Sequence, residues 1–349
     1  MTSVDRPAST PKVNRVGLGK QDYVGSPSTL CKGCGHNSVA SQLVQIAYDL
    51  DLRPQDVIKL SGIGCSSKSP AYFLGQSHGF NSLHGRMPSL GTGALQANHT
   101  LRAIGISGDG DTGSIGLGQF KHVIRRNVRM VYIVENNGVY GLTKGQFSAT
   151  SPEGHELKYA GTNQFPAIDI CLEAIAAGAG FVARTFAGDA KQVREVIKAG
   201  LSFRGTAVID IISPCVAFND EPDSRHSYAY GREHERVLQE VGFIPAQDEI
   251  YIDDYDPGST QVVELHDGAR MTLRKIEAGF DTADRVKGIA RLLEADAAGE
   301  LLTGIVHYDD SRPSLAEVSE MSETPLSMLP DASLRPSAAA LDAFLAGHA

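Results

Sequence analysis

Short apolar runs alternate with amphipathic stretches along the first two thirds of the chain. Runs of four to eight apolar residues predict buried strands, and a 3.6-residue period predicts helices. Residues 37–50, for example, place Val39, Leu43, Ile46 and Leu50 on one helical face. The predicted strands are residues 56–60, 102–107, 129–135, 181–185 and 207–212. The predicted helices are residues 37–50, a glycine-rich helix after Pro88, and residues 113–126, 167–178 and 189–201. This alternation predicts an α/β fold with a doubly wound, mainly parallel sheet.

Residues 102–135 form the clearest unit of this pattern. A strand, a helix and a second strand at this spacing predict a right-handed βαβ crossover, so the two strands run parallel. Asp109 follows the first strand and Asn137 follows the second. Both residues should therefore lie at the carboxyl edge of the sheet, where doubly wound folds bind ligands.

The pattern changes after about residue 236. Residues 262–273 resemble a hairpin around Asp267-Gly268, a polar helix follows at 283–298, and residues 305–308 form an apolar strand. We therefore predict a small C-terminal α+β extension. The predicted divisions are an N-terminal extension at 1–27, read as a tail or a strap over a partner, a main domain at 28–235, an extension lobe at 236–325 and a surface tail at 326–349.

Composition excludes several classes of protein. The formal charge is −9 and no basic run is present, which argues against nucleic acid as a partner. No apolar stretch is long enough to cross a bilayer, and the N-terminus lacks the apolar core of a signal peptide. Five cysteines without a secretory signal indicate a reducing compartment rather than disulfides. We therefore expect a cytoplasmic protein with no membrane partner.

The turn Gly108-Asp109-Gly110-Asp111 has the character of a diphosphate site. Backbone N–H groups and a helix N-terminus after a buried strand bind phosphate groups well. The glycines also match G-x-G-x-x-G, so a dinucleotide site with Glu135 on the ribose is an alternative. The negative charges of Asp109 and Asp111 would repel a pyrophosphate that carries no metal. A Mg²⁺ between the carboxylates and the phosphates would remove this repulsion. Asp109, the Asn137 amide and the Val139 carbonyl could supply its oxygen ligands.

The cysteines form a second candidate site. Cys31 and Cys34 make a C-x-x-C hook, and Cys65 and Cys215 each follow a predicted strand. If those two strands run parallel to the others, both cysteines lie at the same sheet edge as the Gly-Asp-Gly turn. Four scattered thiolates suit a [4Fe–4S] cluster, whereas structural zinc more often uses two close pairs; zinc remains an alternative. Cys171 lies inside an amphipathic helix, which indicates core packing.

Five motifs together resemble the thiamine diphosphate-binding β subunit of 2-oxoacid:ferredoxin oxidoreductases, over about residues 28–235. They are Cys31-Lys-Gly-Cys-Gly-His36, Gly62-Ile-Gly-Cys-Ser-Ser-Lys68, His84-Gly-Arg86, Gly108-Asp-Gly-Asp111 and Asn136-Asn-Gly-Val-Tyr-Gly-Leu-Thr-Lys-Gly-Gln146. Lys32 departs from the proline of many relatives but occupies no ligand position. The resemblance implies the diphosphate-binding domain of the thiamine-diphosphate fold.

The resemblance also implies roles for individual residues. Cys31, Cys34, Cys65 and Cys215 would ligate one [4Fe–4S] cluster, and Asp109, Asn137 and the Val139 carbonyl would hold Mg²⁺. Lys68 and Lys144 would face the substrate carboxylates as catalytic residues, together with His84. The residues implied to contact thiamine diphosphate are Ile63, Gly64, Cys65, Ser66, His84, Gly110, Asp111, Gly141 and Leu142.

The implied activity is oxidative decarboxylation of a 2-oxoacid, with coenzyme A taking the acyl group and ferredoxin the electrons. The reaction is reversible, and its reversal would be reductive carboxylation, a form of carbon fixation. The resemblance places the Glu that activates the cofactor on a separate α subunit, so we expect an αβ or (αβ)₂ enzyme. The 141–146 segment and the C-terminal lobe resemble the 2-oxoglutarate branch. The alternatives are a pyruvate or broad 2-oxoacid enzyme, a decarboxylase without redox chemistry, a NAD-dependent dehydrogenase and a non-catalytic metal scaffold.

Overall fold

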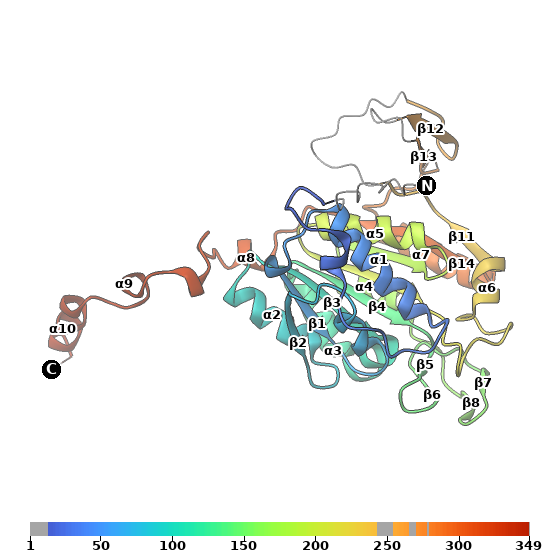
Figure 1. Ribbon diagram of the computed structural model, residues 1–349, viewed down its shortest axis with the longest axis horizontal. Helices are drawn as coiled ribbons and strands as arrows, with labels where there is room; N and C mark the ends of the chain where they lie inside the picture. Colours follow the sequence, from blue (N-terminus) through green and yellow to red (C-terminus); the bar gives the residue numbers. More distant parts are fainter. Residues whose placement is uncertain (1–12, 243–253, 265–269, 278, 349) are drawn as a thin grey trace, which may run out of the picture.

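The computed structural model describes residues 13–242, 254–264, 270–277 and 279–348. An eight-stranded sheet crosses the molecule in the order β11-β14-β9-β10-β4-β3-β1-β2 (Figure 1). The six strands from β9 to β2 in this order run parallel. Strand β14 pairs antiparallel with β9, and β11 pairs parallel with β14. The strands are β1 Val57–Ser61, β2 His78–Asn81, β3 Arg102–Gly108, β4 Met130–Asn136, β9 Phe181–Phe186, β10 Thr206–Ile212, β11 Glu235–Val237 and β14 Leu301–Tyr308.

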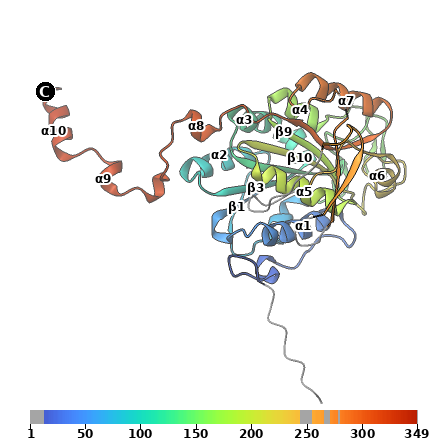
Figure 2. The same cartoon turned by 90° about the horizontal axis from the view of Figure 1, so that it is seen from above.

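Helices cover both faces of this sheet, as Figure 2 shows from above. Helices α1 (Gly35–Asp49) and α5 (Ala190–Ser202) pack on one face through a shared apolar cluster. The second face carries α2 (Met87–Ala97), α3 (Leu117–Arg126), α4 (Ile170–Ala177) and α7 (Arg285–Ala297). Successive residues of a strand point to opposite faces, so Ile133 joins the first cluster and Tyr132 and Val134 join the second. The predicted doubly wound sheet is confirmed.

The βαβ unit of residues 102–135 forms as predicted, with β3 and β4 parallel and adjacent. Its helix begins later than the expected residue 113, because Gly110–Ile115 forms a wider π-helical turn before α3. The Gly116 N–H donates to the Asp111 carbonyl five residues earlier, at 2.8 Å. Single π-helical turns of this kind often occur at functional sites.

The C-terminal part contributes to the central sheet. Strands β12 (Thr260–Glu264) and β13 (Arg270–Arg274) form the expected antiparallel hairpin, and its turn at Asp267-Gly268 lies outside the described residues. Strand β14, by contrast, pairs with β9 inside the main sheet. The predicted lobe 236–325 therefore shares its strand β14 with the core of the main domain.

The two ends of the chain behave differently. Residues 13–27 pack on the domain itself rather than forming a tail, because Tyr23 is fully buried and its hydroxyl donates to the Leu52 carbonyl at 2.8 Å. The C-terminal segment leaves the body of the molecule with exposed side chains, as predicted for a surface tail (Figures 1 and 2). Within the described residues, no helix combines the length and apolar character needed to cross a bilayer.

The remaining short elements complete the chain. They are η1 Lys20–Tyr23, η2 Pro54–Asp56, η3 Ser66–Ala71, β5 Val139–Tyr140, β6 Gln146–Phe147, β7 Glu156–Leu157, β8 Gly161–Thr162, α6 Tyr228–His234, α8 Leu315–Val318, η5 Leu326–Met328, α9 Asp331–Leu334 and α10 Ala338–Ala346. Strand β5 follows the carboxyl end of β4 and helix η3 follows that of β1, and residues of both line the candidate site.

Candidate cofactor and cluster site

Four neighbouring parallel strands deliver the candidate residues to one edge of the sheet. Strands β10, β4, β3 and β1 are adjacent in that order, and the loop that follows each of them carries a predicted site residue. Those residues are Cys215, Asn137, Asp109 and Cys65. The sequence-based expectation that the Gly-Asp-Gly turn and both isolated cysteines share one edge is therefore confirmed.

Asp109 is buried and partly saturated by hydrogen bonds. Its Oδ2 atom accepts from the Gly138 N–H at 3.0 Å and from the hydroxyls of Thr150, at 2.7 Å, and Ser148. Among the residues that the structure describes, its Oδ1 atom accepts only from the Asn137 N–H, at 3.5 Å. Burial raises the pKa of the Asp109 carboxyl, against the lowering effect of the hydroxyl bonds. A buried carboxylate with one open oxygen fits a divalent cation, because a nearby positive charge favours its ionised form.

Asn137 and Val139 lie beside this carboxylate. The Val139 N–H donates to the Asn137 Oδ1 atom at 3.1 Å, and the Asn219 side chain donates to the Asn137 carbonyl at 2.8 Å. These bonds fix the amide next to Asp109. Amide and carboxylate oxygens are ligands that Mg²⁺ prefers, so this donor set fits the predicted metal.

The glycines next to Asp109 and Asp111 allow close approach of the loops. A Cβ on Gly110 would lie 2.5 Å from the Tyr140 ring, and the Tyr140 hydroxyl donates to the Gly110 carbonyl at 3.0 Å. A Cβ on Gly62 would lie 2.2 Å from the Asp111 carboxylate. Both positions therefore require glycine for steric reasons.

Asp111 holds three loops together. Its Oδ1 accepts from the Gly85 N–H at 2.7 Å, and its Oδ2 accepts from the Ser107 hydroxyl at 2.8 Å and the Ile63 N–H at 3.2 Å. Both oxygens of the Asp111 carboxylate thus accept hydrogen bonds from the protein itself. Its predicted contact with a diphosphate stays a prediction, and the structure gives the side chain a clear role in shaping the loops around the site.

The four predicted cluster cysteines line one cavity of about 250 Å³. Lys68, Lys144, Gly141 and Leu142 line the same cavity. All four cysteines are free thiols; Cys34 and Cys215 are buried, Cys65 is half-buried and Cys31 is exposed. Cys171 is fully buried in the core and away from this cavity, as predicted.

The thiols in this cavity are poor thiolates without a metal. Burial raises the pKa of Cys34 to about 12, and burial likewise raises the pKa values of Cys65 and Cys215. The nearby backbone N–H groups of Ala217, Phe218 and Asn219 oppose this effect and lower the pKa of Cys215. Thiolates gathered in one buried cavity and met by backbone donors fit a positively charged metal group.

The distance between the cysteine sulfurs distinguishes a four-iron cluster from a single zinc ion. Within the described residues, no three His, Cys, Asp or Glu side chains are gathered tightly enough to hold one metal ion. Four sulfurs on one tetrahedral Zn²⁺, at about 2.3 Å each, would lie only about 4 Å apart. In a four-iron cluster each sulfur binds its own iron and stays farther from the others. The described side chains therefore form no ready-made zinc site, and the four-iron cluster stays the prediction made from the sequence.

Two buried residues at the site had no role in the thiamine diphosphate hypothesis, although His36 ends the first motif and Glu135 was the ribose ligand of the dinucleotide alternative. His36 and Glu135 line the narrow cavity beside Asp109, and His36 also lines the cysteine cavity. Glu135 is fully buried, and its carboxyl group accepts a hydrogen bond from Ser69. It therefore cannot reach a ribose, which removes the acidic residue that a dinucleotide site would need. The motif itself could have indicated His36, which lies two residues after Cys34 of the C-x-x-C hook.

The other predicted residues occupy different positions around the two cavities. Ile63, Gly64 and Ser66 line the cavity beside Asp109, together with Cys65, Gly110 and Gly141. Lys144 is exposed at a positive φ of 79°, a strained conformation for a non-glycine residue that is often kept at binding sites. His84 is exposed and lines neither cavity, although its neighbour Gly85 is tied to Asp111.

Comparisons with known proteins agree with this geometry. Residues 62–211 match the family "Thiamine pyrophosphate enzyme, C-terminal TPP binding domain". The chain is 42% identical over 191 residues to a 2-oxoacid:ferredoxin oxidoreductase subunit beta of Saccharolobus solfataricus, covering 54% of this chain and 63% of that one. It is 36% identical over 220 residues to the 2-oxoglutarate oxidoreductase subunit KorB of Mycobacterium tuberculosis, covering 62% and 58%.

A third relative is covered more fully. The 2-oxoglutarate synthase subunit KorB of Methanocaldococcus jannaschii is 37% identical over 196 residues, which is 55% of this chain and 71% of that one. The matches thus span less than two thirds of the S. solfataricus and M. tuberculosis subunits.

A solved structure extends the likeness over nearly the whole chain. It is a 2-oxoglutarate:ferredoxin oxidoreductase from Magnetococcus marinus with 2-oxoglutarate, coenzyme A and succinyl-CoA bound. The TM-score is 0.69 at 26% identity, over 94% of this chain and all of that one. With a mainly parallel sheet, a diphosphate-type turn and four cysteines at one edge, the chain belongs to the family of β subunits of 2-oxoacid:ferredoxin oxidoreductases.

Proposed function

We propose that this chain is the β subunit of an enzyme that converts 2-oxoglutarate and coenzyme A to succinyl-CoA and CO₂. Two oxidised ferredoxins would each take one electron, and one proton would be released. The observation that carries the proposal is the shared wall of the two cavities: His36, Cys65, Asn137 and Gly141 line both. A carbon-chemistry cofactor and an electron acceptor on the two sides of one wall fit oxidation in single-electron steps.

The chain's own residues would divide the work. Asp109, Asn137 and the Val139 carbonyl would hold Mg²⁺ with the diphosphate, and Cys31, Cys34, Cys65 and Cys215 would hold the [4Fe–4S] cluster. Thiamine diphosphate would supply the carbon nucleophile for decarboxylation, and the cluster would supply a one-electron acceptor. Exposed Cys31 marks the side of the cavity from which electrons would leave to ferredoxin.

Two lysines support a dicarboxylate as substrate. Lys68 and Lys144 line the cysteine cavity beside Gly141 and Leu142. Two ammonium groups could meet the two carboxylates of 2-oxoglutarate, whereas pyruvate has only one. The KorB names of two relatives and the 2-oxoglutarate bound in the M. marinus enzyme support the same substrate. The broader name of the S. solfataricus relative favours a wider range of 2-oxoacids as the second candidate.

The α subunit completes the proposal. The relatives are named as β subunits, and the described part of this chain shows one domain of the cofactor-binding type. We infer that the α subunit supplies the Glu that activates the cofactor, in an αβ or (αβ)₂ assembly, and that this chain is inactive by itself.

The test is anaerobic co-purification of this chain with its α subunit. We expect about four irons per β chain and one thiamine diphosphate, with a brown absorption spectrum. The enzyme should reduce ferredoxin with 2-oxoglutarate and coenzyme A at a kcat/KM at least tenfold above that with pyruvate, about 1.4 kcal/mol in transition-state binding. Equal values would favour the broad enzyme. A colourless protein without thiamine diphosphate would refute both.

A further inference from the structure

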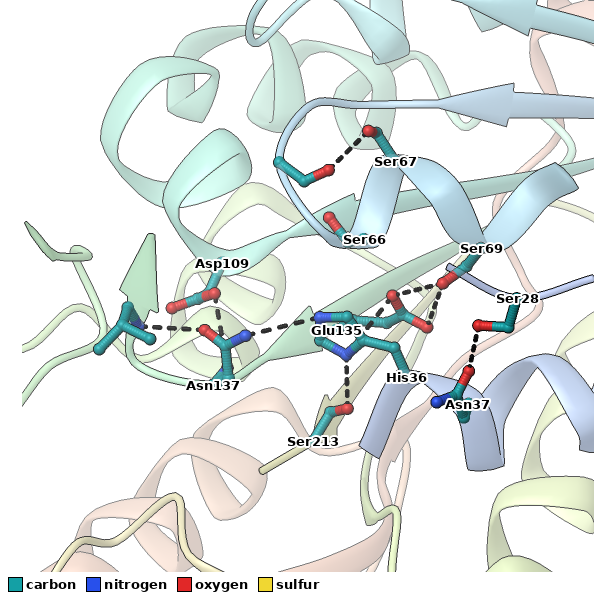
Figure 3. A network of polar contacts seen from close by, with 12 residues as sticks. Ser28, His36, Asn37, Ser66, Ser67, Ser69, Asp109, Glu135, Asn137 and Ser213 are labelled. Atoms are coloured by element: carbon teal, nitrogen blue, oxygen red, sulfur yellow. Dashed lines mark hydrogen bonds and ion pairs between the residues drawn. The ribbon is translucent and has the colours of Figure 1, made fainter. Parts of the chain in front are cut away.

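Glu135 lies at the centre of a buried polar network between the two cavities (Figure 3). It sits near the end of β4 with no exposed surface. Its two carboxyl oxygens lie 3.0 and 2.9 Å from the Ser69 hydroxyl, and Oε2 lies 3.6 Å from the His36 Nδ1 atom. A carboxyl group at this depth is costly to bury, so the network around it has to satisfy its oxygens.

Each cysteine-bearing segment contributes one member of this network. His36 lies two residues after Cys34, Ser69 lies four residues after Cys65, and Ser213 lies two residues before Cys215. The His36 Nδ1 atom lies 2.7 Å from the Ser213 hydroxyl. We call Glu135, His36, Ser69 and Ser213 the Glu135 network.

The same network reaches the magnesium side of the wall. Glu135 lies two residues before Asn137 on the same strand end, and the His36 Nε2 atom lies 3.5 Å from the Asn137 amide nitrogen. Figure 3 shows Asp109, Asn137, His36 and Glu135 in one row. Segments that are far apart in sequence therefore meet through polar contacts at this wall.

Other contacts join these segments in pairs: Gly35 packs closely on Ser213 and Pro214, and the Thr29 N–H donates to the Tyr72 hydroxyl at 3.1 Å. The cysteine cavity is open enough to hold a group of about 250 Å³, and Cys31 at its rim is exposed. A direct backbone bond joins Gly35 to Pro214 at 3.1 Å, but Ser69 reaches the other cysteine segments through Glu135. Fully satisfied buried networks select one arrangement of their members.

We propose that Glu135 is a positioning residue, which holds the three cysteine segments and Asn137 in the arrangement that both the cluster and the magnesium diphosphate require. The inference rests on the proposed function, since it concerns how those two groups are held. It assigns Glu135 no contact with substrate.

The test compares Glu135→Leu with Glu135→Gln in the co-expressed αβ enzyme. Leucine removes the polar contacts, whereas glutamine keeps an acceptor for Ser69 and nearly the same volume. Thr206→Val is the matched control, because Thr206 is a fully buried hydroxyl at the opposite end of a neighbouring strand. The readouts are iron and sulfide content, the electron paramagnetic resonance spectrum of the dithionite-reduced cluster, and thiamine diphosphate affinity by calorimetry.

We expect Glu135→Leu to lose at least half of its iron, to broaden the resonance spectrum and to weaken thiamine diphosphate binding about tenfold or more. Glu135→Gln should restore all three values to near those of the wild type, and Thr206→Val should only lower the melting temperature. If Glu135→Leu does not fold, Ser69→Ala gives the same comparison with a smaller change, and we expect reduced iron and a broadened spectrum.

Two outcomes contradict the inference in distinguishable ways. Wild-type iron, spectrum and cofactor affinity in Glu135→Leu, or in Ser69→Ala where the leucine variant does not fold, overturn it alone. A wild-type enzyme purified without iron and thiamine diphosphate would overturn the proposed function, and this inference with it.

Discussion

The Asp109 site and the cysteine cavity share a wall but are built in different ways. Around Asp109, the candidate ligands span 30 positions (109 to 139), against 184 (31 to 215) for the four cysteines, and the carboxylate is already fixed by Gly138, Ser148 and Thr150. The four cysteines come from three distant segments, and within the described residues no disulfide or single-ion geometry joins them. The candidate magnesium site is thus largely arranged in the folded chain itself, whereas the proposed cluster site depends on contacts between distant segments.

This contrast predicts how binding of the magnesium diphosphate and of the cluster should each respond when a single ligand residue is removed. A preorganised site loses affinity in steps as single ligands are removed, since its other contacts persist. A site made of separate segments should lose its metal group as a whole when one segment loses its ligand. The predictions below are ordered from the largest expected effect to the smallest.

The largest effect is expected from removing a cluster cysteine. Cys65→Ala or Cys215→Ala should lower iron to near zero and abolish ferredoxin reduction, because each thiolate would bind one iron. In the Cys215 variant, thiamine diphosphate affinity should stay within about threefold of the wild type, since Cys215 does not line the cavity beside Asp109 and the Asp109 contacts persist. Cys171→Ala is the control: it should keep all iron and cost about 1 kcal/mol of stability. Full iron in the Cys215 variant would remove that cysteine from the ligand set.

Asp109→Asn should have the next largest effect, on the other side of the wall. Losing the carboxylate charge should weaken magnesium and thiamine diphosphate binding by about 100-fold. Iron content should remain that of the wild type, because none of the cysteine segments is bonded to Asp109. Calorimetry measures thiamine diphosphate affinity, and iron analysis of the same preparation measures the cluster content. Loss of both affinity and iron would show that the two sites are not independent.

Replacing the cavity lysines should change substrate binding only. Lys68→Gln or Lys144→Gln should raise the KM for 2-oxoglutarate about tenfold, the loss of about 1.4 kcal/mol of ionic contact. Pyruvate lacks the second carboxylate, so only one of the two lysines would contact it. The KM for pyruvate should therefore rise less in the variant of the other lysine. Lys191→Gln, an exposed lysine on α5 outside both cavities, should leave both values unchanged. Equal shifts for both substrates in both variants would argue against a dicarboxylate site.

The smallest effect concerns stability at acid pH on the magnesium side. Burial lowers the pKa of His226 to about 3, and this ring packs on Gly138 beside the Asn137 ligand. A folded pKa below the unfolded value of about 6.5 means that the unfolded chain binds more protons in acid. Stability should therefore fall as pH drops below about 6.5, by about 2 kcal/mol at pH 5 for this residue.

Urea unfolding at pH 7.5 and pH 5.0 checks this pH dependence. His226→Gln removes the titration, so its midpoint should change less between the two pH values than that of the wild type. An equal change in both proteins would assign the acid sensitivity to other groups.

Much of the fold followed from the sequence because the apolar periodicity was regular there. The strands from 102 to 135 and the parallel crossover placed Asp109 and Asn137 at one edge before any coordinates were considered. The same reasoning brought Cys65 and Cys215 to that edge, since each follows a strand parallel to the others. Cys171 was separated from them by its helical apolar face.

Other features were beyond sequence reasoning because they depend on contacts between distant residues. The π-helical turn at Gly110–Ile115 depends on loops that Asp111 ties together. The entry of β14 into the main sheet depends on its pairing with β9, and nothing local in residues 301–308 indicates that edge. His36 and Ser213 are 177 positions apart, so their contact leaves no local pattern.

The sequence by itself determined the five strands β1, β3, β4, β9 and β10 with the helices between them, the diphosphate-type turn and the identity of the cysteines, because periodicity and motif spacing are local properties. It did not indicate β2 and β11. Only the tertiary structure decided which oxygen of Asp109 stays open, which loops Asp111 holds and how Glu135 connects the cysteine segments. The reason is physical: burial and hydrogen-bond saturation are properties of a neighbourhood in space, and that neighbourhood exists only after the chain has folded.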